Sequence, residues 1–428
     1  MMSAPSSIHP VQAADDSERP LRILIISSLF PPFVMGGAEM AAHSLAIWLA
    51  RNGHTVHALT GVARREDAGI DADSAGFTIE RRFFPNIYPL YQANEKRPIR
   101  KLVWHARDHL NPDSESIVRA AIESFRPDIV NTHDIQGIGY NLLREIGRQG
   151  LPCVQTLHDF GFICINMNMF RQGKPCRRRH FSCAVSGMVK RSYLSSIERL
   201  AFWAPSQSLL DRYRPHLPPL AEAACIQLPL LFSSPPRVRR DASLPVRLLY
   251  VGQVTAPKGV EFLLDMLQPL ATTGGFEITI VGGGSLLDHL RRRHPWARFT
   301  GRVPPDEVAG FMAASDVLMM PSLWAENAPV VTYQAILQGL PMVASRIGGL
   351  PELVRDGVNG ILLPPGGLAQ WQACVRDLLA QPGKLDRLRG GARQCASSYD
   401  PNVLGGAVVR LFRRTIGAVA THEEALAV

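Results

Sequence analysis

Several residues that could carry chemistry lie just beyond short apolar runs of this sequence. Lys258 stands in a loop of glycine and proline, and a lysine beside glycines favours a phosphate partner. The pair His158 and Asp159 follows another apolar run, and His133 and Asp134 repeat that arrangement. Each pair is placed for substrate contact if the run is a strand. A hydrogen-bonded structural histidine is the alternative for each pair.

Three glycine-containing loops could approach an anion. Gly36 and Gly37 precede a helical pattern, so a ligand could come close to the backbone and to the N–H groups of the helix start. The second loop begins with Gly252 and Gln253, and Gly283 is the middle glycine of the third. The third loop has neither the spacing nor the acidic partner of a dinucleotide fingerprint. A tight turn without a ligand is the alternative interpretation.

The elements that must position these residues alternate between strands and helices. Short runs rich in β-branched and other apolar residues, each followed by a helical pattern, are typical of parallel sheets with right-handed crossovers. The expected strands are 21–28, 55–60, 128–132, 153–157, 246–251, 276–281, 317–320 and 341–344, and the expected helices are 38–51, 139–149, 258–270 and 329–338. Residues 65–115 are expected to form only loop and helix.

Two consecutive α/β domains are expected, because the strand-first pattern starts twice. Residues 1–20 read as a disordered tail, and 21–232 as the N-terminal domain. Clustered prolines in 229–245 indicate a linker, after which 240–400 form the C-terminal domain and 401–428 a last helical stretch. Ligands of such sheets bind beyond the carboxyl ends of the strands, so the cleft between the domains is the expected site.

The amino-acid composition excludes several classes of protein. The 428 residues have 46% hydrophobic and 19% charged content, which excludes collagen-like, coiled-coil and disordered chains. The net charge of +9 suits an anionic ligand, a nucleic acid or an anionic membrane surface. Seven cysteines, an odd number, favour a reduced, cytoplasmic compartment. We find no secretory signal and no apolar run long enough to span a membrane.

Cysteines and basic residues concentrate after His158. Cys164, Cys176, Cys183 and His180 could supply four zinc ligands, but they lack the close cysteine pair of structural zinc sites, so reduced thiols in a loop are expected. The same stretch contains Arg171, Lys174, Arg177, Arg178, Arg179, Lys190 and Arg191. It is either a solvated basic loop or a surface for anionic lipid head groups or a phosphorylated acceptor.

The order and spacing of these motifs resemble the retaining glycosyltransferases of family 4, which have the GT-B fold. The resemblance covers about residues 21–415. It is carried by Gly36-Gly37-Ala-Glu39, Gly53-His54, Thr156-Leu-His158-Asp159, Gly252 with Lys258-Gly259, Val281-Gly282-x-Gly284, the stretch Glu326 to Pro341, and Gly348-Gly-x-Pro-Glu352.

The resemblance implies a role for each matching residue. Lys258 would contact the diphosphate of a nucleotide sugar, and Glu326 would lie near the donor sugar. Gly37 would approach the diphosphate from across the cleft, and His158 would face the sugar near the reacting carbon. Asn327 and Ala328 would offer backbone N–H groups, and Gln334 stands where the family has a ribose-binding glutamate. The last helix would return to the N-terminal domain.

The implied reaction moves a sugar from a UDP- or GDP-sugar to a glycan or lipid-linked acceptor, with retention, in cell-surface polysaccharide synthesis. The departing phosphate can take the acceptor's proton, and lysine and backbone N–H groups stabilise its charge, so neither metal nor cofactor is expected. The protein would work in the cytoplasm, with docking at the inner face of the membrane left open.

Two positions depart from the family pattern. Gln253 replaces an arginine that pairs with the lysine, and Gln334 replaces the second glutamate. A charge-assisted contact is worth roughly 1.5–3 kcal/mol, so donor binding should weaken unless Arg302 or Arg346 substitutes. A catalytically weakened binding or scaffold protein is therefore an alternative. A nucleotide-sugar epimerase or NAD-dependent oxidoreductase is disfavoured by Glu326, and nucleic-acid binding rests on the charge alone.

Overall fold

The structure is a computed structural model. It describes residues 19–88, 98–171, 173–176, 178–219, 221–232 and 245–418. Nearly all of the expected tail 1–20, most of the linker 229–245, residues 419–428 and Arg177 lie outside the described residues.

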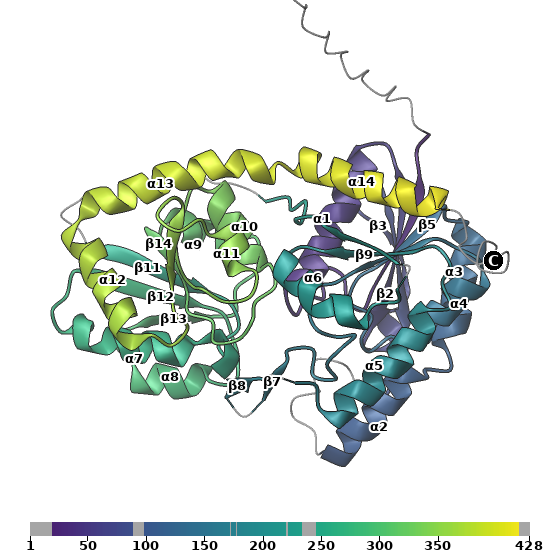
Figure 1. The fold of residues 1–428 in the computed structure, drawn as a ribbon, viewed down its shortest axis with the longest axis horizontal. Coiled ribbons are helices and arrows are strands. Elements are labelled where there is room, and N and C mark those ends of the chain that lie inside the picture. The colour runs from purple at the N-terminus through teal and green to yellow at the C-terminus, as the bar shows by residue number, and fades with distance from the viewer. Residues whose placement is uncertain are drawn as a thin grey trace, which may run out of the picture.

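The N-terminal domain is built on an eight-stranded sheet in the order β10-β9-β6-β5-β1-β2-β4-β3 (Figure 1). All neighbouring strands are parallel except β3 and β4. The strands are β1 Arg22–Ser27, β2 Thr55–Val62, β3 Gly69–Ala72, β4 Thr78–Phe83, β5 Ile129–Thr132, β6 Cys153–Thr156, β9 Leu200–Ala204 and β10 Glu222–Cys225; β7 Phe170–Arg171 and β8 Lys174–Pro175 form a separate hairpin. The helices are α1 Gly37–Arg51, α2 Pro98–His109, α3 Ser114–Phe125, α4 Leu142–Arg148, α5 Phe181–Leu194 and α6 Gln207–Tyr213.

The expectation of only loop and helix over residues 65–115 is wrong, because this stretch contains strands β3 and β4 as well as α2. Strand β4 was not recognised because half of the residues in its sequence, TIERRF, are charged. Glu80 and Arg81 are nevertheless buried. The Glu80 carboxylate lies 2.8 Å from Nε2 of His57 on the neighbouring strand β2. Such pairing across strands satisfies polar groups that no apolar pattern would reveal.

The C-terminal domain has a six-stranded, fully parallel sheet in the order β13-β12-β11-β14-β15-β16. Its strands are β11 Val246–Val251, β12 Phe276–Val281, β13 Arg298–Gly301, β14 Val317–Met320, β15 Met342–Ser345 and β16 Gly360–Leu363. Its helices are α7 Val260–Ala271, α8 Leu287–Arg293, α9 Val308–Ala313, α10 Val330–Leu337, α11 Leu350–Leu353, α12 Leu368–Ala380 and α13 Pro382–Ala396. The predicted α/β class with two parallel-sheet, Rossmann-like domains is confirmed.

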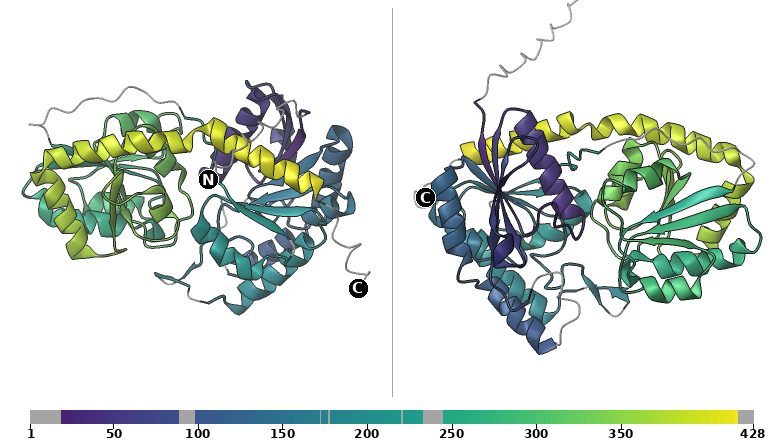
Figure 2. Two further views of the ribbon diagram at one scale, coloured as in Figure 1. Left: turned by 45° about the horizontal axis from the view of Figure 1, so that its top comes forward. Right: turned by 180° about the vertical axis from the view of Figure 1, so that it is seen from behind.

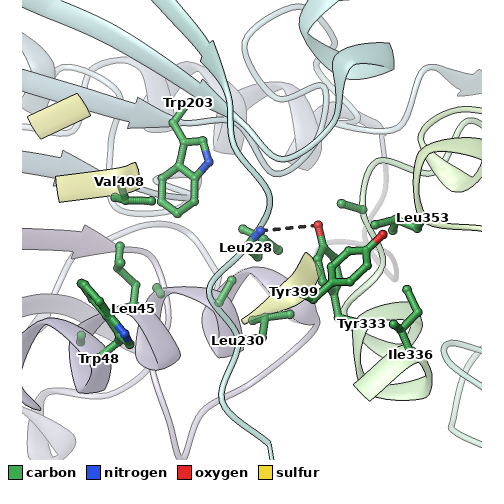
Figure 3. Close-up of a cluster of buried hydrophobic side chains, with 14 of the residues drawn as sticks. Leu45, Trp48, Trp203, Leu228, Leu230, Tyr333, Ile336, Leu353, Tyr399 and Val408 are labelled. Atoms are coloured by element: carbon green, nitrogen blue, oxygen red, sulfur yellow. Dashed lines mark hydrogen bonds between the residues drawn. The ribbon is translucent and has the colours of Figure 1, made fainter. Parts of the chain in front are cut away.

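The last described helix, α14 Pro401–Gly417, leaves the C-terminal domain and packs on the N-terminal one. It follows α13 across the molecule and contacts α1, β6 and β9 (Figure 2). Trp48 of α1 donates its indole N–H to Asn402 at 3.0 Å. Figure 3 shows that Trp48 and Val408 share a buried cluster with Tyr333 and Tyr399, so one apolar core joins the two domains.

We expect Gly405→Ala to destabilise the protein by about 1–3 kcal/mol, because a Cβ there would lie 2.4–2.6 Å from the Trp48 ring. Gly406→Ala is the matched control. The same methyl at Gly406 meets nothing closer than 3.5 Å, and alanine should stabilise the helix by roughly 0.5–1 kcal/mol. Urea unfolding of both variants tests this packing, and equal shifts in one direction would contradict it.

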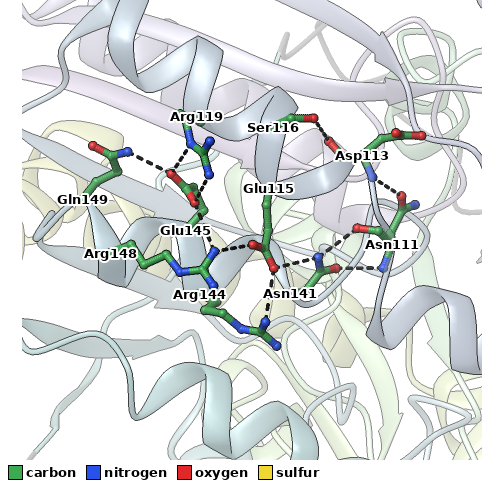
Figure 4. A network of polar contacts seen from close by, with 10 residues as sticks. All are labelled: Asn111, Asp113, Glu115, Ser116, Arg119, Asn141, Arg144, Glu145, Arg148 and Gln149. Atoms are coloured by element: carbon green, nitrogen blue, oxygen red, sulfur yellow. Dashed lines mark hydrogen bonds and ion pairs between the residues drawn. The ribbon is translucent and has the colours of Figure 1, made fainter.

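A polar network joins α3 to α4 (Figure 4). Glu145 accepts hydrogen bonds from Nε and Nη2 of Arg119 at 2.8 and 3.0 Å, and Arg148 donates to Glu115 at 2.5 Å. The hydrogen bonds from Arg119, with those from Gln149 and Arg148, lower the pKa of Glu145 to about 2, so its charge is kept throughout the physiological range. The network braces the β5-α4-β6 unit, whose two strands lead into His133 and His158.

Candidate functional site

Lys258 and Glu326 meet beyond the carboxyl ends of two adjacent strands, β11 and β14. The Lys258 ammonium lies 2.8 and 3.0 Å from the two oxygens of Glu326. Ser322 and Trp324 donate to the same carboxylate at 2.7 and 2.9 Å. Glu326 is buried, whereas the Lys258 side chain is 24% exposed. The carboxylate is therefore fixed by three donors, and the cation beside it remains open to an anion.

Gly259 makes this contact possible. Its φ of +73° places it in the left-handed region, and a Cβ there would lie 2.0 Å from the carbonyl oxygen of Pro321. The loop after β11 can therefore lie directly against the loop after β14, which brings Lys258 to Glu326.

A chain of hydrogen bonds fixes the tautomer of His158 in the opposite domain. The amide N–H₂ of Asn131 donates to Val154 O and Thr156 Oγ1, so its oxygen accepts from His133 Nε2 at 2.9 Å. Burial lowers the pKa of His133 well below its usual value, so His133 is neutral and its Nδ1 is an acceptor. His158 Nε2 lies 2.8 Å from that Nδ1 and must donate to it.

His158 is consequently neutral with its proton on Nε2, which leaves Nδ1 as a hydrogen-bond acceptor. Burial lowers its pKa to about 4. A bare imidazole nitrogen can accept a hydrogen bond from a substrate hydroxyl, and this role does not change between pH 6 and 8.

The neutral histidine pair predicts acid sensitivity. Unfolded histidines bind protons below about pH 6.5, whereas folded His158 resists protonation down to about pH 4. The contribution of His158 to the free energy of unfolding is therefore fully present above pH 6.5 and is lost as the pH decreases toward 4. We expect His133→Leu to cost about 1–3 kcal/mol at pH 7.5, because Asn131 and His158 lose a partner. Its further loss between pH 6.5 and 4 should be smaller than that of the parent.

Urea unfolding at pH 7.5 and pH 5 measures both effects. His289→Leu is the control, because His289 is 55% exposed. Parallel pH curves for the parent and His133→Leu would show that this pair does not carry the acid sensitivity.

Asn327 joins the two halves of the site. Its amide donates to the carbonyl oxygens of Leu157 and His158 at 3.2 and 3.0 Å, and its own oxygen accepts from Ser206 at 2.6 Å. Glu352 of the C-terminal domain accepts the first N–H groups of α6, from residues 207 and 208, at 2.7 and 2.8 Å. The loop that carries Glu326 is thus held directly against the loop that carries His158.

The Gly36-Gly37 loop differs from the expectation that its N–H groups lie free for an anion. Buried Glu39 accepts the Gly36 N–H at 3.1 Å and the Met35 N–H at 3.4 Å. A Cβ on Gly37 would lie 2.7 Å from the Val330 side chain at the start of α10. Close packing of α1 against the C-terminal domain therefore requires a residue without a side chain at Gly37, and the Gly36 and Met35 N–H groups are already taken by Glu39.

The glycine loops of the C-terminal domain pack on one another. Gly252 lies against Gly282, where a Cβ would come within 1.8 Å of the Gly252 carbonyl oxygen. Gly283 faces open space apart from Arg302, whose Cβ would be 3.8 Å away. Gln253 is exposed and reaches Met35 O at 3.4 Å across the domain boundary.

Of the two arginines that could substitute for the missing one, Arg302 is the better placed. It is exposed beside Gly283, and its charge acts on Glu39. Arg346 instead bonds Asp356 at 2.6 Å. The remaining expected residues, Ala328 and Gln334, are buried, Ala328 just before α10 and Gln334 within it.

The sequence interpretation missed a buried charge cluster behind the site. Lys190 was expected in a basic loop, and this is wrong: it lies on α5 with 1% exposure. Its ammonium donates to Gly161 O at 2.6 Å and lies 3.9 Å from the Tyr140 ring centroid. Its charge acts on Asp108, Asp134 and Asp159. A helical pattern over 181–194 is the signal that could have revealed the helix.

The cysteine stretch forms no metal centre among the described residues, where no group of three or more suitable side chains converges. Cys164 and Cys183 are buried free thiols, Cys183 on helix α5 rather than in a loop. Cys176 lies 3.9 Å from His180 Nε2. In the described part of the chain, no helix is both long and apolar enough to cross a membrane.

Comparisons with known proteins match both domains to glycosyltransferases. Residues 35–219 match the family described as Glycosyltransferase Family 4, and residues 245–381 match Glycosyl transferases group 1. Glycogen synthase of Mycobacterium tuberculosis is 27% identical over 414 residues, covering 92% of this chain and 94% of that protein. The amylovoran biosynthesis glycosyltransferase of Erwinia amylovora is 34% identical over 155 residues, 33% of this chain and 38% of that protein.

Solved structures show the same architecture. Sucrose-phosphate synthase of Thermosynechococcus elongatus superimposes with a TM-score of 0.73 at 19% identity, covering 93% of this chain and 100% of that one. An Anabaena protein, HepE, solved with UDP, gives 0.64 at 18% identity, covering 92% and 100%. Two facing Rossmann-like domains with the site between them define the GT-B class. The chain belongs to the GT-B glycosyltransferases, as the sequence resemblance predicted.

Proposed function

We propose that this glycosyltransferase moves a sugar from a UDP- or GDP-sugar to a glycan or lipid-linked acceptor, with retention of configuration and without a metal. The observation that carries the proposal is the Lys258–Glu326 pair, held by Asn327 against His158. Lys258 would bind the diphosphate, Glu326 would lie beside the sugar, and His158 Nδ1 would accept a sugar hydroxyl.

The chemistry needs charge stabilisation at the leaving diphosphate. A partly exposed lysine fixed by a buried carboxylate supplies a preorganised cation there. Arg302, beside Gly283, would supply the second positive charge that Gln253 lacks. The relatives support this donor class: one is a glycogen synthase, and the Anabaena protein was also solved with UDP-glucose.

Nucleotide binding in EDTA is the first test. UDP, GDP, ADP and their sugar conjugates are titrated by calorimetry, and one base should bind clearly without metal. Turnover with that donor then follows, with the anomeric configuration of the product read by NMR. An inverted product or an absolute metal requirement would refute that part of the proposal. Nucleotide binding without transfer to any acceptor tested would favour the weakened binding protein.

We further propose that the outer face of α2 and α5 rests on an anionic membrane surface. The two helices are in contact and expose six large apolar side chains, those of Ile99, Leu102, Val103, Phe181, Val185 and Met188. Exposed Arg100, Arg178 and Arg191 lie on or next to these helices. Apolar side chains among cations suit the head-group region of an anionic bilayer.

Vesicle sedimentation tests this surface. We expect binding to phosphatidylglycerol vesicles that weakens with salt, and a large loss in the double variant Phe181→Ser/Met188→Ser. Val403→Ser is the control, because Val403 is 62% exposed on α14, away from these helices. Equal binding to uncharged phosphatidylcholine vesicles, or none to either, would contradict the proposal.

A further inference from the structure

A cavity of about 510 Å³ lies in the N-terminal domain between the loop after His158, the β7-β8 hairpin and helices α2 and α5. Four large apolar residues, Ile163, Ile165, Met169 and Phe170, are among those that line it. The hairpin itself lies at the base of the gap between the two domains (Figure 1). The cavity is thus bordered by the proposed membrane-facing helices and by the loop that follows His158.

The lining is also strongly cationic. Lys101, Arg171, Arg178 and Arg179 all line the cavity, together with His180, and no carboxylate is among its lining residues in the described part of the chain. Arg171 lies 3.5 Å from a ring nitrogen of His180, and Arg179 bonds His216 at 2.8 Å. None of the four cations pairs with an acidic side chain of the described residues, so the cavity presents uncompensated positive charge.

The path from this cavity to His158 is short and rigid. The loop 159–164 connects them, and Lys190 holds its middle by the bond to Gly161 O. Tyr213 accepts the Phe162 N–H at 3.2 Å and donates to Asp159 O at 2.8 Å. A molecule whose charged group sat in the cavity would therefore be held at a fixed position relative to His158.

We propose that this cavity binds the phosphate or diphosphate of an acceptor lipid, with the start of its hydrocarbon chain on the apolar lining residues. The ligand class is an amphiphile that joins a phosphate group to an isoprenoid or alkyl chain. The four cationic side chains can bind the phosphate oxygens. The Ile163, Ile165, Met169 and Phe170 side chains can contact the hydrocarbon chain of the lipid. The inference rests on the proposed function for its role as acceptor, but binding itself does not require it.

Calorimetry with three probes tests the pairing of charge and chain. Farnesyl diphosphate, below its micelle concentration, should bind at least tenfold more tightly than inorganic diphosphate or farnesol. The double variant Arg171→Gln/Arg178→Gln should weaken farnesyl diphosphate at least tenfold. Arg291→Gln/Arg292→Gln, on the exposed surface of α8, removes the same charge and should leave this affinity unchanged.

Each contrary outcome has a distinct meaning. Inorganic diphosphate that binds as well as the farnesyl compound would overturn the lipid assignment, and farnesol that binds equally would overturn the phosphate assignment. Loss of affinity in the α8 control would show a bulk-charge effect and overturn the site. If Phe181→Ser/Met188→Ser abolishes farnesyl diphosphate binding together with vesicle binding, the ligand is a membrane surface and not a molecule in the cavity.

Nucleotide binding is measured on the same preparations. The Arg171→Gln/Arg178→Gln variant should keep the parent's affinity for UDP or GDP, because both residues lie outside the Lys258–Glu326 site. Farnesyl diphosphate binding in a protein that binds no nucleotide would defeat the proposed function and leave this site standing. Nucleotide binding without farnesyl diphosphate binding would do the reverse.

Discussion

Replacing Lys258 with alanine should lower kcat/KM for the donor by about 10²–10³-fold. Preorganised charge at the leaving group is worth that much in comparable sites. Among the residues that the structure describes, no second lysine contacts Glu326, and Gln253 stands where the family has an arginine. Most of the loss should be in kcat, because the negative charge on the diphosphate grows as the bond to the sugar breaks.

The matched control for this variant is Lys384→Ala. Lys384 is also partly exposed, belongs to the same domain and is paired with Asp377. It should change kcat/KM by less than twofold. Thermal unfolding must accompany the kinetics, because the alanine also removes a partner of buried Glu326. Normal turnover in folded Lys258→Ala would refute the assigned role, and Arg302→Ala would then be the next variant to measure.

Lys190→Met should destabilise the protein by about 3–5 kcal/mol at pH 7, the cost of removing the cation from a buried charge group. Burial raises the pKa of Asp108 to about 7 and that of Asp159 to about 6. Acids raised in this way bind more protons folded than unfolded, so their cost to stability grows as the pH rises from about 4 to 7. The loss in Lys190→Met should accordingly be smaller at pH 5, where both are largely protonated.

Arg191→Met is the neighbouring control. Arg191 is exposed on the same helix, and its replacement should stay within about 0.5 kcal/mol of the parent. Urea unfolding at pH 5 and pH 7 gives all the values needed. A Lys190→Met loss that is equal at the two pH values would show that the methionine acts by disturbing packing and not by removing a charge.

Strands and helices with a clear periodicity of apolar residues could be predicted from the sequence. The strand Phe276–Val281 and helix 38–51 were expected nearly as they occur, because their apolar periodicity is strong. The family resemblance assigned Lys258 to the diphosphate and Glu326 to the donor sugar, and the structure places the two side chains 2.8 Å apart. Because parallel strands end at a common edge, the position of a loop after a strand is enough to assign it to one site.

The features that were not predicted depend on contacts between residues that are distant in the sequence. Strand β4 was missed because Glu80 is satisfied by His57, a residue 23 positions earlier. Lys190 looks like any surface lysine until its carboxylate neighbours are known. The side chain of Asn327 was assigned no role, since its three partners lie more than a hundred positions away. Glu39, expected only as part of a motif, accepts the Met35 and Gly36 N–H groups just before α1.

The return of α14 sets an order of events during synthesis. Trp48 and its partner Asn402 are 354 positions apart, so α1 lacks its cover until almost the whole chain has left the ribosome. At roughly 5–20 residues per second, this delay is about twenty seconds to a minute. The first domain to emerge is therefore the last to be completed, and during that time its exposed apolar face would be a natural substrate for a chaperone.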